Sequence, residues 1–248
     1  MLAAIRPPWM IKTRSMLLVG LAAAFIAFSA LVASGATFAA DDAASRYFKS
    51  IHGNAALDAA MIAITTMGDV TVLFPVGIIL TIIRRTRKVG MIFLIALVVL
   101  VVLVLYIKPL LGRPIPPYGF DPALDLPENF GIESDSFSPI AAGCLLPSGQ
   151  PTSCSYPSGH ASRATALAFI AGFALYNKSR MAGYLLWAFP VTIGITRLYV
   201  MQHYPTDIVG GILFGVVISV ILSNAMKLEQ PFFMSRFKGK NDDPQALR

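Results

Sequence analysis

The stretch VGMIFLIALVVLVVLVLYI, residues 89–107, contains no charged side chain and ends at Lys108. A basic cluster at residues 84–88 precedes it. The hydrocarbon core of a bilayer is roughly 30 Å thick and is crossed by about 20 apolar residues in a helix. We therefore predict that residues 89–107 form a transmembrane helix, which places the chain among membrane proteins.

The composition of the whole chain agrees with this assignment. The 248 residues are 56% hydrophobic and only 13% charged, and their mean hydropathy is +0.67. Soluble globular domains carry about 25% charged residues. The net charge of +7 lies in short connections rather than along one soluble face. It therefore indicates membrane orientation, and no nucleic-acid partner is expected.

Five further apolar stretches predict an all-α, polytopic protein of six transmembrane helices. They lie at residues 16–36, 61–83, 159–177, 181–196 and 205–226. Residues 46–60 are more polar and are expected to form an interfacial helix or loop. The proline-rich segment 110–156 cannot contain a continuous helix, because proline lacks an amide donor and clashes with the preceding turn.

Basic residues mark alternate connections, and this pattern predicts the orientation. They occur before the first span, in the connections at 84–88 and 178–180, and in the tail at 231–248. Under the positive-inside rule both termini are cytoplasmic and the loop 110–156 is external. The expected location is a bacterial inner membrane, with the external loop on the periplasmic side.

Three regions follow along the chain. Residues 1–40 contain the first helix, which is either a membrane anchor or a cleaved signal peptide, because its end resembles a cleavage site. Residues 41–230 form the membrane domain, which includes the external loop. Residues 231–248 form a basic cytoplasmic tail.

The two cysteines, Cys144 and Cys154, lie in the external loop. No cluster of His or Cys with metal-ligand spacing accompanies them, so no metal site is expected. They are expected to form a disulfide in an oxidising compartment, with free thiols as the alternative.

Three polar clusters fall on the external side of this topology, at residues 108–116, 156–163 and 197–207. They are far apart in sequence, but the ends of the third, fourth and sixth helices can bring them to one external pocket. Ionisable groups at membrane depth are costly unless they are paired or used. The clusters therefore predict a functional site. Gly68 and Asp69, near the external end of the second helix, either shape this pocket or cap a helix.

The second cluster contains Pro157-Ser158-Gly159-His160. Ser158 is a favourable N-cap for the helix that follows, and Gly159 lets a ligand approach the backbone. The amides of the first turn, aided by the helix dipole, form a binding site for an anion. His160 would stand beside a phosphate bound there.

The third cluster predicts a nucleophile. Pro205 suits the first position of a helix, which places His203 just before that helix and Asp207 in its first turn. A carboxylate so placed holds one imidazole nitrogen and leaves the other free to attack, as in a catalytic triad. Arg197 can offer two parallel donors to phosphate oxygens, and Lys108 adds a point charge.

These clusters resemble the signature of the type 2 phosphatidic acid phosphatase (PAP2) family, which shares its site with vanadium haloperoxidases. The signature is a Lys, six residues and Arg-Pro; then Pro-Ser-Gly-His; then Ser-Arg, five residues, His, three residues and Asp. The second motif is intact at residues 157–160. The third motif keeps its spacing at Arg197, His203 and Asp207, and Thr196 stands where Ser is usual.

The resemblance implies a metal-independent phosphatase that needs no cofactor. It implies that His203 is the nucleophile and forms a phosphohistidine, that Asp207 orients it, and that His160 is the general acid. It also implies a set of phosphate ligands, namely Lys108, Ser158, Gly159 and Arg197.

The first motif departs from the pattern. After Lys108 and six intervening residues, the arginine of the signature would fall at position 115, where this chain has Ile115. Arg113 lies two positions earlier, before Pro114, and is the candidate for the missing phosphate-binding guanidinium. Arg163, near the start of the fourth helix, is expected to be a cation that extends to the membrane interface.

The expected function is hydrolysis of a phosphomonoester, or of the terminal phosphate of a diphosphate, on a membrane lipid. The residues do not choose among undecaprenyl diphosphate, phosphatidic acid, phosphatidylglycerol phosphate and a lipid A phosphate. A lipid phosphotransferase is the nearest alternative. A non-enzymatic lipid transporter would show charges deep in the spans or broken helices in matched halves, whereas here the polar groups gather at one set of helix ends.

Overall fold

The structure, a computed structural model, describes residues 6–123, 144–145 and 151–230. These residues form nine helices and one pair of short strands, so the chain is all-α as predicted. The helices are α1 (Met16–Ala33), α2 (Phe38–Ser50), α3 (Ala55–Thr66), α4 (Val70–Ile82), α5 (Arg87–Leu111), α6 (Gly159–Lys178), α7 (Arg180–Leu185), α8 (Ala188–Tyr199) and α9 (Pro205–Ala225). The strands are β1 (Cys144–Leu145) and β2 (Pro151–Thr152). Much of the predicted external loop, at 124–143 and 146–150, and the predicted tail at 231–248 lie outside the described residues.

Several helices are able to cross a bilayer. Among the described residues, four segments are long and apolar enough: α1, α5, α9 and the unit Arg180–Tyr199, which consists of α7 and α8. The pair α3 and α4 makes a fifth if it is counted as one span, although it is bent by 49°. The chain is therefore an integral membrane protein with several candidate spans. This confirms the polytopic class, but not the predicted number of six.

The fourth predicted span corresponds to α6, which packs against α5, α8 and α9. Its polar side chains are buried within the bundle. The hydroxyl of Ser162 donates to the Gly159 carbonyl at 2.9 Å, and that of Thr165 donates to the Ala161 carbonyl at 2.7 Å. Small and hydroxyl-bearing residues are common where membrane helices face one another. Because protein surrounds α6, its apolar character is weaker than that of the helices that face lipid.

The second predicted span, residues 61–83, is not one straight helix. It is divided between α3, which begins earlier, and α4. The break has a local cause: the Asp69 carboxylate accepts both the amide and the hydroxyl of Thr71 at 2.8 Å, and so starts a new helix. The interfacial segment expected at 46–60 is shared between the end of α2 and the start of α3.

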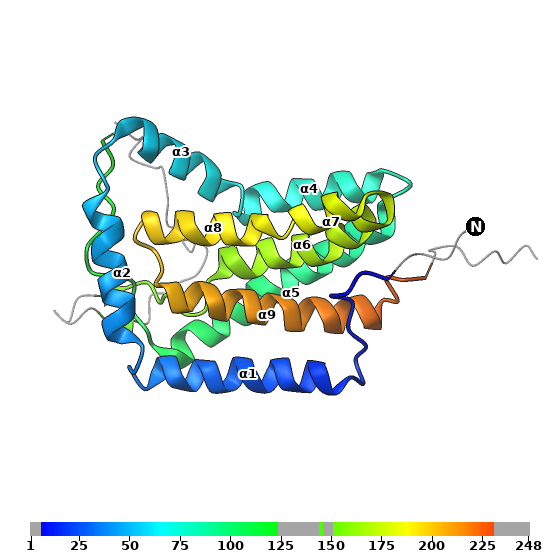
Figure 1. Cartoon of the computed structure of the whole chain (residues 1–248), viewed down its shortest axis with the longest axis horizontal. Coiled ribbons are helices and arrows are strands. Elements are labelled where there is room, and N and C mark those ends of the chain that lie inside the picture. Colours follow the sequence, from blue (N-terminus) through cyan, green and yellow to red (C-terminus); the bar gives the residue numbers. More distant parts are fainter. Residues whose placement is uncertain (1–5, 124–143, 146–150, 231–248) are drawn as a thin grey trace, which may run out of the picture.

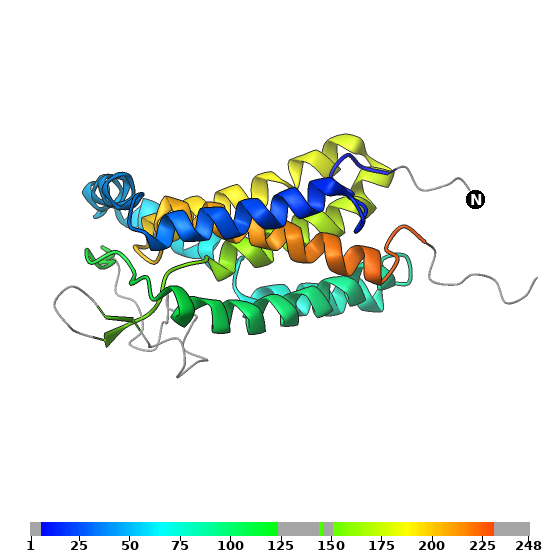
Figure 2. The same ribbon diagram turned by 90° about the horizontal axis from the view of Figure 1, so that it is seen from below.

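The long helices lie side by side, and α2 crosses one end of them (Figure 1). In the view turned by 90°, α9 lies between α1 and α5 (Figure 2). Glycines on α9 bring it close to α6. A Cβ at Gly211 would lie 2.5 Å from the Ser158 carbonyl oxygen, and one at Gly215 would lie 2.6 Å from the Ser162 carbonyl oxygen. The two helices therefore meet backbone to backbone near their starts.

The first helix, α1, packs along α9. Phe25 stacks on Phe214 with ring centroids 5.1 Å apart. The hydroxyl of Ser29 lies 2.8 Å from the hydroxyl of Tyr156. Tyr156 directly precedes Pro157 and the motif at 157–160. α1 thus contacts the segment that leads into the predicted site.

The end of the bundle crossed by α2 also holds the last turns of α5 and α8 and the first turns of α6 and α9 (Figure 1). The chain that leaves α5 runs along α2. The Tyr118 hydroxyl donates to Asp42 at 2.6 Å, and the Lys49 ammonium donates to the Gly119 carbonyl at 3.2 Å. α2 therefore fixes the start of the predicted external loop.

Two short pairings connect the described parts of that loop. β1 and β2 are antiparallel, with Cys144 opposite Thr152. Cys154 forms a β-bridge with Pro114 and is joined to Cys144 by a disulfide, which is the pairing expected from the sequence. The chain after α5 and the chain before α6 are thus held next to each other.

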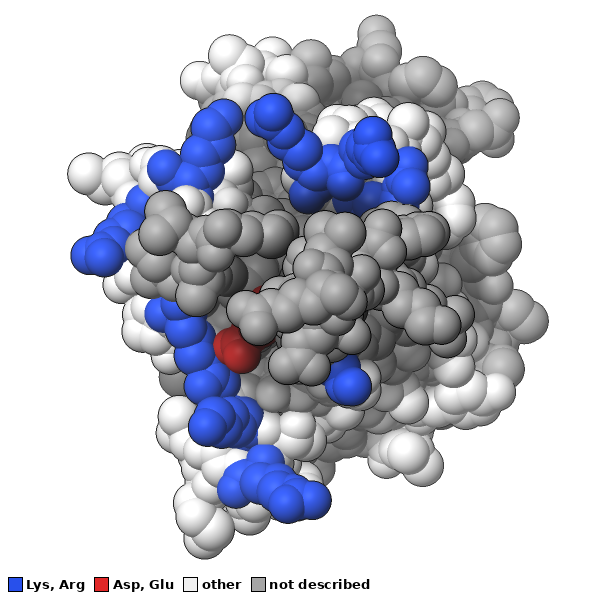
Figure 3. Space-filling model, turned by 90° about the vertical axis from the view of Figure 1, so that its right-hand side faces the viewer, with Lys and Arg blue, Asp and Glu red and all other residues white. Residues whose placement is uncertain are grey.

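The opposite end of the bundle, where the connections at 84–88 and 178–180 lie, is basic. Most of the charged side chains that are visible on this end are Lys and Arg (Figure 3). The predicted site and the basic connections are therefore at opposite ends of the bundle.

Candidate active site

The second and third polar clusters meet through their backbones. The amide of Ser158 donates to the carbonyl of Asp207 at 3.0 Å. The close approach of Gly211 to the Ser158 carbonyl oxygen holds the two helix starts together. Segments that are separated by about 50 residues in sequence therefore share one small region at the ends of α6 and α9.

His203 lies in the turn between α8 and α9 and is buried. Its Nδ1 atom is 3.5 Å from Oδ2 of Asp207. The same oxygen accepts the Tyr204 amide at 2.7 Å, which fixes the carboxylate at the start of α9. The distance between His203 and Asp207 exceeds that of a normal hydrogen bond, and catalytic hydrogen bonds often shorten only when substrate binds. With Nδ1 facing the carboxylate, Nε2 is the nitrogen that is left for chemistry.

Burial lowers the pKa of His203 to about 4. The Asp207 carboxylate opposes this shift, while the charges of Arg197 and Lys108 add to it. A histidine with a pKa below its ordinary value of about 6.5 is neutral at pH 7. The imidazole therefore has a lone pair available for attack at neutral pH.

His160 lies in the first turn of α6 and is also buried. Its Nε2 atom is 3.5 Å from Oδ2 of Asp69, the residue at which α4 begins. Gly68 is in contact range as well, since a Cβ there would lie 3.2 Å from the His160 ring. Of the two roles considered from the sequence, Asp69 fulfils that of a helix cap, and both residues also lie next to His160. Asp69 was not among the predicted site residues, because nothing in the apolar run shows that its helix bends toward His160.

Arg163 does not extend to the membrane interface as predicted. Its side chain is buried, with 6% of the residue exposed, and Nη2 is 3.3 Å from Nδ1 of His160. A Cβ at position 159 would lie 3.0 Å from Nη1, so the absence of a side chain at Gly159 leaves room for the guanidinium. The physical reason for the difference is that Arg163 lies on the face of α6 that is turned into the bundle, so it is surrounded by protein.

The remaining predicted phosphate ligands surround the same helix start. Ser158 is the N-cap of α6, and its Oγ accepts the Ala161 amide at 3.4 Å. Lys108 is in the last turn of α5 and Arg197 is in the last turn of α8, and both are buried. The positive charges of Lys108 and Arg197 act on the His160 imidazole. The structure therefore brings the following predicted residues to one end of the bundle: Lys108, Ser158, Gly159, His160, Arg197, His203 and Asp207.

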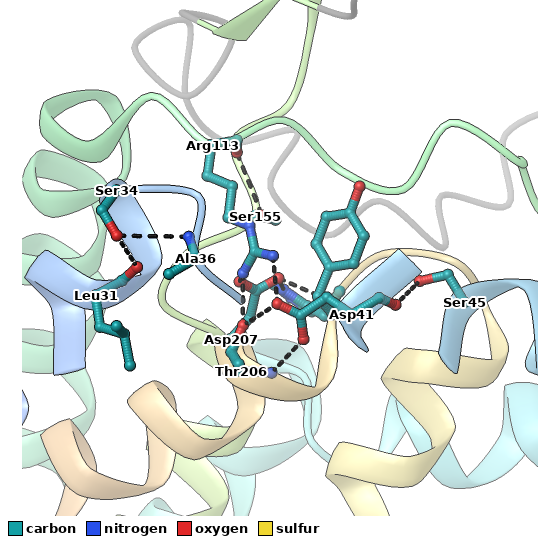
Figure 4. A network of polar contacts seen from close by, with 11 residues as sticks. Leu31, Ser34, Ala36, Asp41, Ser45, Arg113, Ser155, Thr206 and Asp207 are labelled. Atoms are coloured by element: carbon teal, nitrogen blue, oxygen red, sulfur yellow. Dashed lines mark hydrogen bonds and ion pairs between the residues drawn. The ribbon is translucent and has the colours of Figure 1, made fainter. Parts of the chain in front are cut away.

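The Arg113 guanidinium is bound by two carboxylates. Its Nη1 donates to Oδ1 of Asp207 at 2.7 Å and its Nη2 donates to Oδ2 of Asp41 at 2.6 Å (Figure 4). The guanidinium also lies over the Tyr204 ring, 4.2 Å from the centroid. Two carboxylates thus engage its terminal nitrogens, and Arg113 contacts the Asp207 oxygen that does not face His203.

Asp41 is a second residue that sequence reasoning missed. It lies in the first turn of α2, and only 1% of it is exposed. The sequence shows it only as the first acid after a long apolar run. A buried carboxylate needs a partner, but the partner, Arg113, is 72 residues away. No local pattern indicates this pairing.

A profile of the PAP2 superfamily matches residues 87–231, more than half of the chain. Two curated relatives match shorter segments. Lipid A 1-phosphatase of Rhizobium johnstonii is 37% identical over 67 residues, which are 27% of this chain and 26% of that protein. Undecaprenyl-diphosphatase BcrC of Bacillus subtilis is 30% identical over 78 residues, 32% of this chain and 38% of that protein. The matched segments thus span less than half of each relative.

Two solved structures share the fold. The transmembrane PAP2 type phosphatidylglycerolphosphate phosphatase of Bacillus subtilis superposes with a TM-score of 0.67 at 21% identity, over 87% of this chain and 98% of that one. LpxE of Aquifex aeolicus superposes with a TM-score of 0.51 at 22% identity, over 72% of this chain and 91% of that one. The arrangement of helices described above is therefore an established membrane fold.

Proposed function

The chain belongs to the PAP2 superfamily, and on this premise we propose that it is a membrane enzyme that hydrolyses a phosphate ester or diphosphate on a lipid through a phosphohistidine. The supporting observation is the convergence of two buried histidines, each 3.5 Å from a carboxylate, with three buried cations beside them, Lys108, Arg163 and Arg197. Buried charges within a membrane protein are costly unless they serve a function. A bound phosphoryl group would place its negative charge next to these cations.

The substrate phosphate binds at the start of α6. The first-turn amides of a helix lack partners within that helix, and the helix dipole favours an anion there. The hydroxyl of Ser158 accepts a bond as the cap of α6 and keeps its own hydrogen to donate. Arg197 and Lys108 neutralise the remaining phosphate oxygens. Together these groups hold the phosphorus atom in front of His203.

The reaction has two steps. In the first, Nε2 of His203 attacks phosphorus and the bond from phosphorus to the lipid oxygen breaks. His160, which carries a second proton once the phosphate anion is bound, gives that proton to the lipid oxygen. In the second, His160 takes a proton from water, the water oxygen attacks phosphorus, and the bond between phosphorus and Nε2 breaks. Inorganic phosphate leaves, and both imidazoles return to their starting protonation states. Asp207 stabilises the positive charge that His203 acquires in the intermediate.

The orientation in the membrane follows from the two ends of the bundle. We place the basic connections at 84–88 and 178–180 in the cytoplasm and the site on the periplasmic face of a bacterial inner membrane. Six crossings result if α6 and the bent pair α3 and α4 each span the bilayer. The contact between Ser29 and Tyr156 supports a first helix that remains in the folded protein as an anchor.

The substrate is a lipid whose phosphate reaches the external interface. The names of the relatives support three candidates: a lipid A phosphate, undecaprenyl diphosphate and phosphatidylglycerol phosphate. Phosphatidic acid is a fourth candidate, from the chemistry of the site alone. In each of these lipids a phosphate or diphosphate is attached to a hydrophobic anchor, which can remain in the bilayer while the head group enters the site.

The test is phosphate release by the purified protein in detergent or vesicles, measured with a panel of these four lipids. We expect release from at least one lipid and none from the His203→Ala variant, which should insert and fold as the wild type does. Release at the wild-type rate by His203→Ala would contradict the mechanism. Movement of the phosphate to a second lipid instead of to water would identify a phosphotransferase.

A further inference from the structure

The arginine of the irregular first motif is held in a buried network outside the phosphate site. Four side chains form this network: Asp41, Arg113, Thr206 and Asp207 (Figure 4). Every donor-acceptor distance within it is between 2.6 and 3.2 Å. Only 11% of the Arg113 side chain is exposed, 2% of the Asp41 side chain and none of the Asp207 side chain. Charge-assisted hydrogen bonds at these lengths are strong and directional.

The contacts of Asp207 divide between its two oxygens. Oδ1 accepts Nη1 of Arg113 at 2.7 Å. Oδ2 accepts the Tyr204 amide and faces Nδ1 of His203. With Oδ1 held by the guanidinium, the carboxylate cannot rotate without breaking a bond on each side. Arg113 therefore determines which oxygen faces the nucleophile.

Asp41 completes the network from α2. Its Oδ2 accepts Nη2 of Arg113 and the hydroxyl of Thr206, both at 2.6 Å. Its Oδ1 accepts the Thr206 amide at 3.2 Å. The Thr206 hydroxyl in turn accepts Nη1 of Arg113 at 2.6 Å. Asp41 thus binds both the guanidinium and the first turn of α9, next to Asp207.

The backbone of Arg113 is fixed as well. Its carbonyl accepts the amide of Ser155 at 2.7 Å and the hydroxyl of Ser155 at 3.3 Å. The next residue, Pro114, is bridged to Cys154, which the disulfide joins to Cys144. The backbone that carries the guanidinium is therefore fixed by hydrogen bonds and a disulfide, although Arg113 belongs to a long loop.

We propose that Arg113, held by Asp41, is a positioning residue for the Asp207 carboxylate and not a ligand of the phosphate. This inference rests on the proposed function, because it assigns Asp207 the role of orienting the nucleophile. Arg113 offsets part of the negative charge of Asp207 and fixes its direction, and Asp41 holds the guanidinium in place. The signature would place a phosphate-binding arginine at position 115. In this chain the arginine stands at position 113 and binds two carboxylates.

The two roles have different kinetic consequences. A lost phosphate ligand weakens the binding of any phosphate-like anion and raises KM. A lost positioning residue lowers kcat and leaves the binding of inorganic phosphate or orthovanadate unchanged. Binding of these two anions to the protein in detergent can be measured by calorimetry, which requires no turnover.

The experiment compares Arg113→Gln with Arg197→Gln, the matched variant at a predicted phosphate ligand. We expect Arg113→Gln to lower kcat about tenfold to a hundredfold, as the loss of an orienting partner does at other sites, with anion affinity unchanged. Arg197→Gln should weaken anion binding about tenfold or more, because a hydrogen bond to a charged group is lost. Arg113→Lys should recover part of kcat, because it restores one donor to Asp207.

The pH dependence of kcat/KM separates a positioning role from a purely structural one, because loss of structure alone would not shift its acid limb. Among the residues that the structure describes, the charged or titratable groups that act on His203 include Lys108 from α5, His160 from α6, Arg197 from α8 and Asp207 from α9. Without the Arg113 charge, the Asp207 carboxylate acts more fully on His203 and raises its pKa. The acid limb of kcat/KM should therefore move to higher pH in Arg113→Gln.

Asp41→Asn tests the second half of the network. It should reproduce the loss of kcat, and the double variant with Arg113→Gln should lose less than the two single losses combined, because the residues act as one unit.

Thermal unfolding in detergent identifies variants that fail to fold, and Arg113→Lys provides a folded alternative. Weaker anion binding with normal kcat in Arg113→Gln would overturn the proposal, as would unchanged values of both. The absence of phosphate release by the wild type would instead overturn the proposed function.

Discussion

The two histidine–carboxylate pairs have the same separation, but their carboxylates differ in the other hydrogen bonds that hold them. In each, a ring nitrogen lies 3.5 Å from a carboxylate oxygen. Asp207 binds a guanidinium with one oxygen and a backbone amide with the other. Asp69 uses Oδ1 to cap α4 through Thr71, and within the described part of the chain its Oδ2 has no hydrogen-bond partner. One carboxylate is held on both sides and the other on one side.

This difference matches the two proposed duties. The nucleophile must face phosphorus in a single direction while it acquires a positive charge, so a rigid carboxylate is useful there. The general acid, His160, gives up a proton in one step and takes one back in the next. A carboxylate with one oxygen that makes no other hydrogen bond can adjust its position as the charge of the imidazole changes. We therefore expect the two pairs to respond unequally to the same substitution.

The largest expected effect is that of Asp207→Asn. The amide can no longer fix the tautomer of His203 or stabilise the imidazolium, and the corresponding loss in a catalytic triad is about ten-thousandfold. We expect kcat to fall about a thousandfold to ten-thousandfold in phosphate-release assays. A fall of less than tenfold would show that the carboxylate on this side is not required.

A smaller effect is expected of Asp69→Asn. General acid–base catalysis contributes about a hundredfold to ten-thousandfold in all, and this change perturbs the acid without removing it, so kcat should fall about tenfold to a hundredfold. An activated leaving group such as nitrophenyl phosphate needs less protonation, and its hydrolysis should be nearly normal. An equal loss with lipid and nitrophenyl substrates would contradict an acid-supporting role for Asp69.

The smallest effect is a shift in pH dependence. Because burial lowers the pKa of His203 to about 4, the neutral nucleophile persists as the pH falls below the ordinary histidine value of about 6.5. Activity should be lost only when the pH falls through the lowered pKa. The acid limb of kcat/KM for the wild type should therefore lie below pH 6.5, and Asp69→Asn should leave it in place. A limb at or above pH 6.5 would show that the nucleophile is not buried as described.

Much of this arrangement could be predicted from the sequence. The apolar runs identify α1, α5 and α9, because uninterrupted hydrophobicity over that length is typical of a helix that crosses a bilayer. The motif at 157–160 and the spacing of His203 and Asp207 locate the site, since a helix cap and a helix start fix where those side chains lie. These features depend on neighbours within one or two turns.

The features that escaped prediction depend on distant contacts. The direction of Arg113 is determined by the pairing of its segment with Ser155, 42 residues later. The bend between α3 and α4 depends on a single carboxylate within an apolar run, and the burial of Asp41 depends on its distant partner. An arginine near the start of a membrane helix, such as Arg163, is typical of the membrane interface. Only the packing of α6 shows that this one is buried.

The most direct test of the account is to trap the phosphorylated enzyme. The protein is mixed with a lipid phosphate, quenched at alkaline pH, where phosphohistidine survives, and mapped by mass spectrometry. The account predicts phosphate on His203 in the wild type, and none in His203→Ala. With nitrophenyl phosphate, which needs little protonation of its leaving group, His160→Ala should also be labelled on His203. Phosphate on another residue, or turnover with no labelled histidine at any time point, would contradict it.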